Sequence, residues 1–264
     1  MAILRKNKLI GPNLLPKDDA RYKKWRESLK KRPASWCKGL NKETNASVNK
    51  ISQTFLKNGL DNFYVWRERM KKAGKIRSVY PDLLKNGDLA ELIGVVLGDG
   101  HIEKCPRTDG LMIFSNSNNN GFIERYSFLV ERIFDKKPSV SGVGKGVNCT
   151  RIRIYQKRIS ERLGVPVGSR SNLKVEIPKW ISENKEFLIR YLRGLYEAEG
   201  CFCVHKPTST YKLLFSNRNE SLRKIVFDGV ETLGFHPHIS GHQVQISRKE
   251  EVFKCKDLLK FRQY

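Results

Sequence analysis

The sequence predicts an α+β fold in which one unit of roughly a hundred residues is written twice, behind a small helical extension at the N-terminus. Two apolar stretches of helical character, Leu89–Gly100 (LAELIGVVLGDG) and Leu188–Gly200 (LIRYLRGLYEAEG), each end in an acid followed by glycine. The tags FSNSN (114–118) and FSNRN (215–219) follow them at matching places, as do Ser-Gly pairs at 141–142 and 240–241. These matches predict two α-β-β-α-β-β-α copies related by a pseudo-twofold axis. Residues 88–183 form the first copy with its linker, and residues 184–264 form the second.

Each copy is expected to continue from its apolar helix through two strands, a helix, two more strands and a last helix. In the first copy these elements lie at 101–105, 111–115, 120–134, 139–141, 151–155 and 157–163. In the second they lie at 201–205, 211–215, 220–233, 236–240, 243–247 and 250–261. The strands alternate as half-buried strands do. The residues expected to face the helices are Ile152, Ile154, Phe202, Val204, Val244 and Ile246.

The opposite face of these strands is expected to be polar. Its outward residues are Arg151, Arg153 and Tyr155 in the first copy, and Cys201, Cys203, His205, Gln243, Gln245 and Ser247 in the second. Arg, Gln, Tyr and His supply the donors and acceptors that read base edges in a major groove. An ordinary hydrated sheet face is the alternative, and the duplicated pattern in a basic chain favours groove reading.

The extension, residues 1–87, is the more basic part, with 22 Lys and Arg against 7 Asp and Glu. Apolar spacing predicts helices at 46–57 and 60–73, separated by the stop signal Asn58-Gly59. The second helix would carry Arg67, Arg69, Lys71 and Lys72. This pattern suits a small module that lies in a DNA groove with its cations on the phosphates. A solvated basic extension without base readout is the alternative.

Charge indicates the class of partner. The formal net charge is +24 and the isoelectric point about 9.9, which favours a polyanion, with nucleic acid first among candidates. No apolar run approaches the roughly 18 residues that span a bilayer, so no membrane association is expected. No secretory signal is recognised at the N-terminus. We therefore expect an intracellular protein of the cytoplasm, nucleoid or an organelle matrix.

The six cysteines form no CxxC pair, and a disulfide framework is not expected in a chain of this kind. Cys201, Cys203 and His205 alternate as metal ligands can. The preferred interpretation is a strand with polar residues on one face.

Small residues four apart mark one face of each apolar helix: Gly94 and Gly98 in the first, Gly194 and Ala198 in the second. Such faces let two helix backbones approach closely, which predicts a seam between the halves. Asp99 and Glu199 then emerge together at helix C-terminal ends, where the helix dipoles and their mutual repulsion disfavour both charges. A divalent cation would relieve this arrangement. We expect Mg²⁺ or Mn²⁺ to bind at Asp99 and Glu199, together with Gly98 and Ala198 before them.

The two helical stretches resemble the paired LAGLIDADG motifs of single-chain homing endonucleases, and the resemblance covers about residues 88–264. It implies a saddle of two four-stranded antiparallel sheets over DNA, with both strands cut near the pseudo-twofold axis. Asp99 and Glu199 fall on the metal-binding acids of that family, and Asn118 and Asn219 match polar positions that order solvent near the cut.

Two shorter stretches carry further resemblances. Val165–Trp180 resembles a family segment containing GxK, which places Arg170 where the family has a lysine near the active site. Arginine keeps the charge but does not readily shuttle a proton, so Lys174 or Lys157 are alternatives. Residues 36–59 resemble small DNA-binding modules attached to homing nucleases, with Asn41 in place of the usual threonine.

The functional hypothesis is a monomeric, Mg²⁺-dependent DNA endonuclease with a long specific target site, of the kind associated with intron mobility. Neither chain end carries the nucleophile or terminal Asn of an intein, so a freestanding protein is expected. A maturase that grips intron RNA and assists splicing is the first alternative, and a non-cutting DNA-binding regulator is the second. Retention of both acids favours the nuclease. The DNA target is not encoded in any pattern recognised here.

Overall fold

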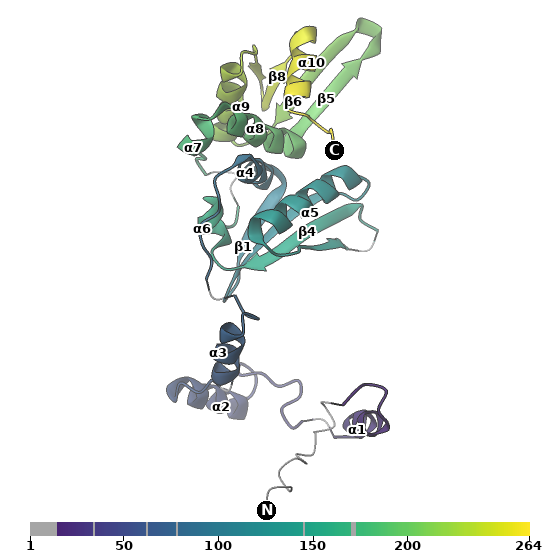
Figure 1. Ribbon diagram of the computed structural model, residues 1–264, viewed down its shortest axis with the longest axis vertical. Coiled ribbons are helices and arrows are strands. Elements are labelled where there is room, and N and C mark those ends of the chain that lie inside the picture. The colour runs from purple at the N-terminus through teal and green to yellow at the C-terminus, as the bar shows by residue number, and fades with distance from the viewer. Residues whose placement is uncertain (1–14, 34, 62, 78, 145, 170–172) are drawn as a thin grey trace, which may run out of the picture. The chain divides into compact units, whose positions relative to one another are not determined.

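The computed structural model describes residues 15–33, 35–61, 63–77, 79–144, 146–169 and 173–264. The chain divides into two compact units, Met1–Ser78 and Val79–Tyr264 (Figure 1). The second unit thus begins before residue 87, where the sequence placed the end of the extension. Leu83 is buried in its core, and Arg158 and Arg162 donate to the carbonyls of Tyr80 and Pro81.

The first unit contains helices α1 (Ala20–Lys30), α2 (Ala46–Lys57) and α3 (Tyr64–Lys72). Helix α2 has the predicted bounds, because Asn45 caps its first turn and Gly59 follows it with a positive φ of 57°. Helix α3 begins at Tyr64 rather than at residue 60, since the Asp61 side chain accepts from the Phe63 amide in a preceding turn. The described residues of these helices include no buried side chain.

The second unit contains the predicted duplication. The first copy comprises α4 (Gly87–Asp99), β1 (Gly100–Lys104), β2 (Asp109–Asn116), α5 (Asn120–Phe134), β3 (Ser139–Gly142), β4 (Cys149–Gln156) and α6 (Ile159–Leu163). After α7 (Lys179–Ser182), the second copy comprises α8 (Lys185–Glu199), β5 (Gly200–His205), the 3₁₀ turn η2 (Lys206–Thr208), β6 (Thr210–Ser216), α9 (Glu220–Thr232), β7 (His238–Ser240), β8 (Gln243–Ile246) and α10 (Lys249–Leu258).

The strands form two four-stranded antiparallel sheets, ordered β1-β2-β4-β3 and β5-β6-β8-β7, which confirms the predicted fold class. Ile152, Ile154, Val244 and Ile246 are buried as expected, and Phe202 packs against the core. Val204 lies on the same face as Phe202 but is 44% exposed, so it is not part of the core as the other helix-facing residues are. It lies near the tip of the β5–β6 hairpin, beyond the helices that cover the sheet.

The two sequence tags are one residue out of step in the sheets. Gly100 pairs with Ile113 on β2, whereas Gly200 pairs with Phe215 on β6, so Ile113 rather than Phe114 occupies the place of Phe215. Phe215 is fully buried and Phe114 lies on the other face, as a slip of one residue requires. The phenylalanines of the two tags therefore do not occupy equivalent strand positions, although Asn116 and Asn217 both accept a hydrogen bond from the backbone amide two residues further on.

Helices α4 and α8 form the seam between the copies, and Figure 1 shows them side by side. Asn86 and Asn184 cap their N-terminal turns. A Cβ at Gly94 would overlap the Tyr191 carbonyl oxygen, and a Cβ at Gly194 would overlap that of Glu91. The small residues therefore permit backbone contact, as predicted. None of the helices in the described part of the chain is both long and apolar enough to cross a bilayer.

Candidate functional site

The acids Asp99 and Glu199 are the last residues of α4 and α8, and the helix seam brings them together. The small residues before them are in contact: a Cβ built at Gly98 would overlap the Ala198 Cβ and lie 3.1 Å from the Glu199 Cγ. Each helix stops at its acid because the next residue, Gly100 or Gly200, has extended backbone angles and begins a strand. The side chains are thus fixed by the two most buried helices of the unit.

The acid pair is electrostatically costly. Burial and the nearby Glu199 charge raise the pKa of Asp99 from 3.8 to about 7. Burial also raises the pKa of Glu199, against the lowering effect of a hydrogen bond from the Asn217 amide, whose Nδ2 lies 3.1 Å from Glu199 Oε1. Across the described residues, neither carboxylate has an ion pair with a cationic side chain.

This donor set fits a hard divalent cation. Two carboxylates meet beside the last carbonyls of two helices, which lack intrahelical partners. Mg²⁺ prefers such oxygen ligands and keeps several waters, so it does not need a third acidic side chain. Within the described residues, no group of three or more His, Cys, Asp and Glu is placed to hold a metal, so the remaining ligands would be carbonyls, water or substrate oxygens.

Two clefts near the acids are lined by polar and basic side chains, of which the sequence had singled out only Asn118. A cleft of about 380 Å³ is lined by Glu199, Ser216, Asn217, Arg218 and His242. A second cleft is lined by Asn116, Asn118, Asn119 and Arg262, and the Arg262 guanidinium lies 3.5 Å from the Gly200 carbonyl oxygen, next to Glu199. The cleft beside Glu199 is thus lined by Arg218, and the Arg262 guanidinium lies near the next carbonyl, an arrangement suited to phosphate groups.

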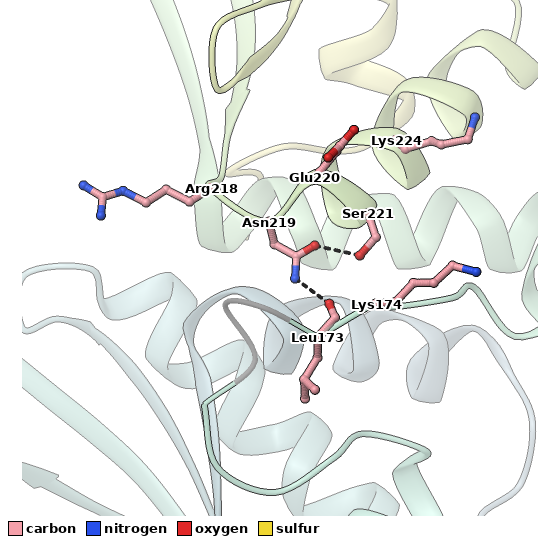
Figure 2. A pocket seen from close by; sticks show the side chains of 7 residues that line it. All are labelled: Leu173, Lys174, Arg218, Asn219, Glu220, Ser221 and Lys224. Carbon is pink, nitrogen blue, oxygen red and sulfur yellow. Dashed lines mark hydrogen bonds between the residues drawn. The ribbon is translucent and has the colours of Figure 1, made fainter.

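The two predicted solvent-ordering asparagines have different surroundings. Asn118 is exposed and lines a cleft, and its backbone amide donates to Asn116 Oδ1. Asn219 is 7% exposed and is the N-cap of α9, and Figure 2 shows its amide between the linker and the start of that helix. It donates to the Leu173 carbonyl at 2.8 Å and accepts from Ser221 Oγ at 2.6 Å. The amide beside the acid pair is instead that of Asn217.

The predicted basic residue of the linker, Arg170, lies outside the described residues. Of its alternatives, Lys174 is paired with Glu176 at 2.8 Å and is 81% exposed, and Lys157 is exposed. The sequence missed Arg262 because it follows the last helix of the second copy, where no counterpart of the linker motif is recognisable.

The outer face of the first sheet carries a connected group of side chains. The Arg153 guanidinium lies over the Tyr155 ring, 5.3 Å from its centroid, and the Tyr155 hydroxyl donates to Glu103 at 3.3 Å. Arg151 pairs with Phe114 in the register, and its buried Nε meets no hydrogen-bond acceptor among the described residues. This face presents cations and an aromatic ring, as predicted.

The outer face of the second sheet is less basic. The Gln245 amide is only 7% exposed, because it accepts from Lys212 Nζ at 3.3 Å and donates to Gln243 at 3.0 Å. His205 Nδ1 is 2.6 Å from Thr208 Oγ1. Ser247 is exposed just after β8. Cys201 and Cys203 have their sulfur atoms 3.4 Å apart.

The four predicted DNA-binding cations of the first unit lie on or beside α3 and divide into two pairs. Arg67 forms an ion pair with Asp61, and Lys71 forms one with Glu68 at 2.6 Å. Arg69 and Lys72 are exposed, and in the described part of the chain neither forms a salt bridge, although the charge of Lys72 helps to lower the pKa of Glu68.

No protein-family model matches the chain. A curated relative, the Replication factor C small subunit of Methanocaldococcus jannaschii, is 28% identical over 165 residues. The match covers 57% of this chain and 9% of that protein, so this chain spans less than a tenth of the relative.

Similar solved structures include LAGLIDADG proteins. I-DmoI in complex with DNA and Ca is 20% identical, with 66% of this chain and 88% of that chain covered and a TM-score of 0.44. The LAGLIDADG meganuclease I-AabMI bound to uncleaved DNA is 15% identical, with 67% and 84% covered and a TM-score of 0.42. Full-length DUF199/WhiA from Thermatoga maritima is 14% identical, with 67% and 56% covered and a TM-score of 0.47.

Proposed function

We propose that this chain is a site-specific endonuclease that cuts double-stranded DNA with a divalent cation held by Asp99 and Glu199. The observation that carries the proposal is the meeting of these two acids at the ends of α4 and α8, without a cationic partner among the described residues. A structural acid pair of this kind would be selected against, since it costs stability and gains no ion pair.

Each group at the site has a role in this proposal. The carboxylates of Asp99 and Glu199 hold Mg²⁺ or Mn²⁺, and Asn217 orients the Glu199 carboxylate through its hydrogen bond. Arg218, His242 and Arg262 bind phosphates on either side of the scissile bond. The bound cation supplies activation of water and stabilisation of the departing 3′ oxygen.

The substrate follows from charge and shape. A chain of net charge +24 binds a polyanion, and two antiparallel sheets with polar outer faces offer a long surface for base readout. The first unit adds cations and would lengthen the contact. Because one chain supplies both helices of the seam, the active form is proposed to be a monomer.

The first test is cleavage of a randomised or host-derived DNA library by full-length protein in Mg²⁺ and in EDTA. Wild type should give discrete double-strand cuts only with the metal. Asp99→Asn and Glu199→Gln should each cut about 10²–10³-fold more slowly while retaining DNA affinity. Glu186→Gln, at the exposed opposite end of α8, is the matched control and should cut normally.

Unchanged cutting by both site variants would refute the proposal. DNA binding without any cleavage by wild type would also refute it and favour the non-cutting regulator. If intron RNA is bound and spliced equally by wild type and the acid variants, the maturase is the better description.

A further inference from the structure

Strand β5 carries two thiols in contact on the outer face of the second sheet. Cys201 and Cys203 are two residues apart, so both side chains point to the same face. Their Sγ atoms are 3.4 Å apart, Cys201 is exposed and Cys203 is partly exposed. At the corresponding positions β1 carries His101 and Glu103, and the thiol of Cys105, which follows β1, lies 3.7 Å from the Glu103 carboxylate.

We propose that Cys201 and Cys203 are a redox-active dithiol that closes reversibly to an intrachain disulfide. Two residues of strand separate their Cα atoms by about 6.6 Å, which is near the upper end of the span a disulfide allows. Because a disulfide also brings its two Cβ atoms to about 3.8 Å, closure requires a bend of β5 between the two cysteines. Among the described residues no third metal ligand joins the pair, and His205 Nδ1 is engaged by Thr208, so oxidation fits this pair better than metal binding.

The oxidant can be a peroxide. The more exposed Cys201 sulfur attacks one peroxide oxygen, the O–O bond breaks, and a sulfenic acid and one water result. The Cys203 sulfur then attacks the Cys201 sulfur, the S–S bond forms, and the sulfenic oxygen leaves as a second water. Two thiols lose two electrons and two protons in total, and one hydrogen peroxide becomes two waters.

A disulfide between Cys201 and Cys203 is expected to change DNA binding, an expectation that rests on the proposed function. Cys201 lies two residues after Glu199, and Cys203 pairs in register with Lys212, whose ammonium holds Gln245. Bending β5 moves this row of outward side chains, so oxidation is expected to weaken DNA binding about tenfold, the equivalent of one good base contact.

The chemical test needs no DNA. Full-length reduced protein is titrated with hydrogen peroxide, and its cysteines are located by alkylation and peptide mass mapping. The proposal expects a Cys201–Cys203 bridge that forms before any modification of Cys105 and reopens with dithiothreitol. Cys105→Ser should bridge like wild type, whereas Cys201→Ser and Cys203→Ser should not. Sulfinic acids or mixed disulfides at these positions without the internal bridge would overturn it.

The second test compares DNA affinity before and after oxidation. Wild type should lose about tenfold and recover on reduction, and the double variant Cys201→Ser/Cys203→Ser should be insensitive to peroxide. Equal affinities of the bridged and reduced forms would overturn the effect on DNA. Failure of the reduced protein to bind DNA would instead count against the proposed function, and the peptide map would still decide the dithiol.

Discussion

Asp99 shows how a single side chain is placed at a thermodynamic disadvantage. It is partly buried at a helix C-terminus beside a second acid, and its pKa rises to about 7. Residues in such environments are concentrated at functional sites, because a cation or substrate can repay the cost when it binds. Removing the charge should therefore improve stability while it damages function.

This trade-off predicts a dependence of stability on pH in the metal-free protein. The folded chain keeps a proton on Asp99 up to about pH 7, whereas the unfolded chain loses it near 3.8. Between these values the folded state binds more protons, so the free energy of unfolding falls as pH rises through about 7. Asp99→Asn should remove this loss and be more stable than wild type near pH 8, by about 1–3 kcal/mol.

Thermal denaturation in EDTA near pH 5 and pH 8 measures the effect. The gain from Asp99→Asn should be larger at the higher pH, and added Mg²⁺ should stabilise wild type more than the variant. Glu186→Gln serves as the control and should not change the pH dependence. An equal loss of stability with pH in wild type and Asp99→Asn would contradict the argument.

Sequence reasoning located the acids but not all of their neighbours. Asp99 and Glu199 were found because an acid follows a small-residue face in both copies. Asn217 was missed because the last asparagine of each FSNxN tag was chosen, whereas the amide that donates to Glu199 belongs to the first asparagine of the second tag. Assigning Asn219 as the helix N-cap from its place before the helical pattern would have left Asn217 as the residue available to the site.

At the scale of elements, α4 and α8 form the seam on which the two copies of the second unit pack. Their backbones touch at Gly94 and Gly194, and the spacing of small residues in the two helices predicted this contact. The sequence did not predict that a charged cluster lies at the same seam. Glu91 is fully buried and accepts from Arg125 and Arg190, with Arg193 3.6 Å away. Ion pairs between residues that are distant along the chain leave no periodic pattern in the sequence.

The close approach of α4 and α8 predicts that an alanine in place of glycine destabilises the protein more at the seam than elsewhere. In Gly94→Ala the new Cβ would overlap the Tyr191 carbonyl oxygen and lie 3.0 Å from the Leu195 nitrogen, and neither backbone atom can move alone. The free energy of unfolding should fall by about 2 kcal/mol or more in denaturant titrations. Gly229→Ala is the control, because its Cβ would meet only Leu192 methyl groups at 3.2 Å or more and Leu188 beyond them. Its change should stay within about 1 kcal/mol, and equal losses in the two variants would contradict backbone contact at the seam.

The charged cluster predicts a second large effect. Glu91→Gln would leave Arg125 without its carboxylate partner and would weaken the pairing of Arg190 and Arg193, which keep Asp88 and Glu197, so urea unfolding should show a loss of about 3 kcal/mol. Arg132→Ala removes a partner of Asp88 whose side chain is 63% exposed, and it should cost under about 1 kcal/mol. A small effect of Glu91→Gln would mean that the cluster is hydrated and does not hold the seam.

At the scale of the whole molecule, the net charge of +24 is divided between two units, and under the proposed function this charge attracts nucleic acid. The fold class, both sheets and helix α2 could be predicted, because each rests on local periodicity or on repetition. The boundary between the units could not, since it depends on Leu83 and on hydrogen bonds from Arg158 and Arg162 that are distant in sequence.

The first unit's cations predict a graded salt dependence of DNA binding. Arg69 and Lys72 form no salt bridge among the described residues, whereas Arg67 and Lys71 pair with Asp61 and Glu68. If α3 contacts phosphates, Arg69→Ala/Lys72→Ala should make the slope of log affinity against log salt about 1–2 units less steep. Arg67→Ala/Lys71→Ala should change it less, because those cations are already partly neutralised and must break ion pairs to reach DNA. Fluorescence anisotropy of full-length protein between about 50 and 200 mM salt measures both slopes. Identical slopes for wild type and both double variants would show that the first unit makes no phosphate contact, and that the second unit alone binds the DNA.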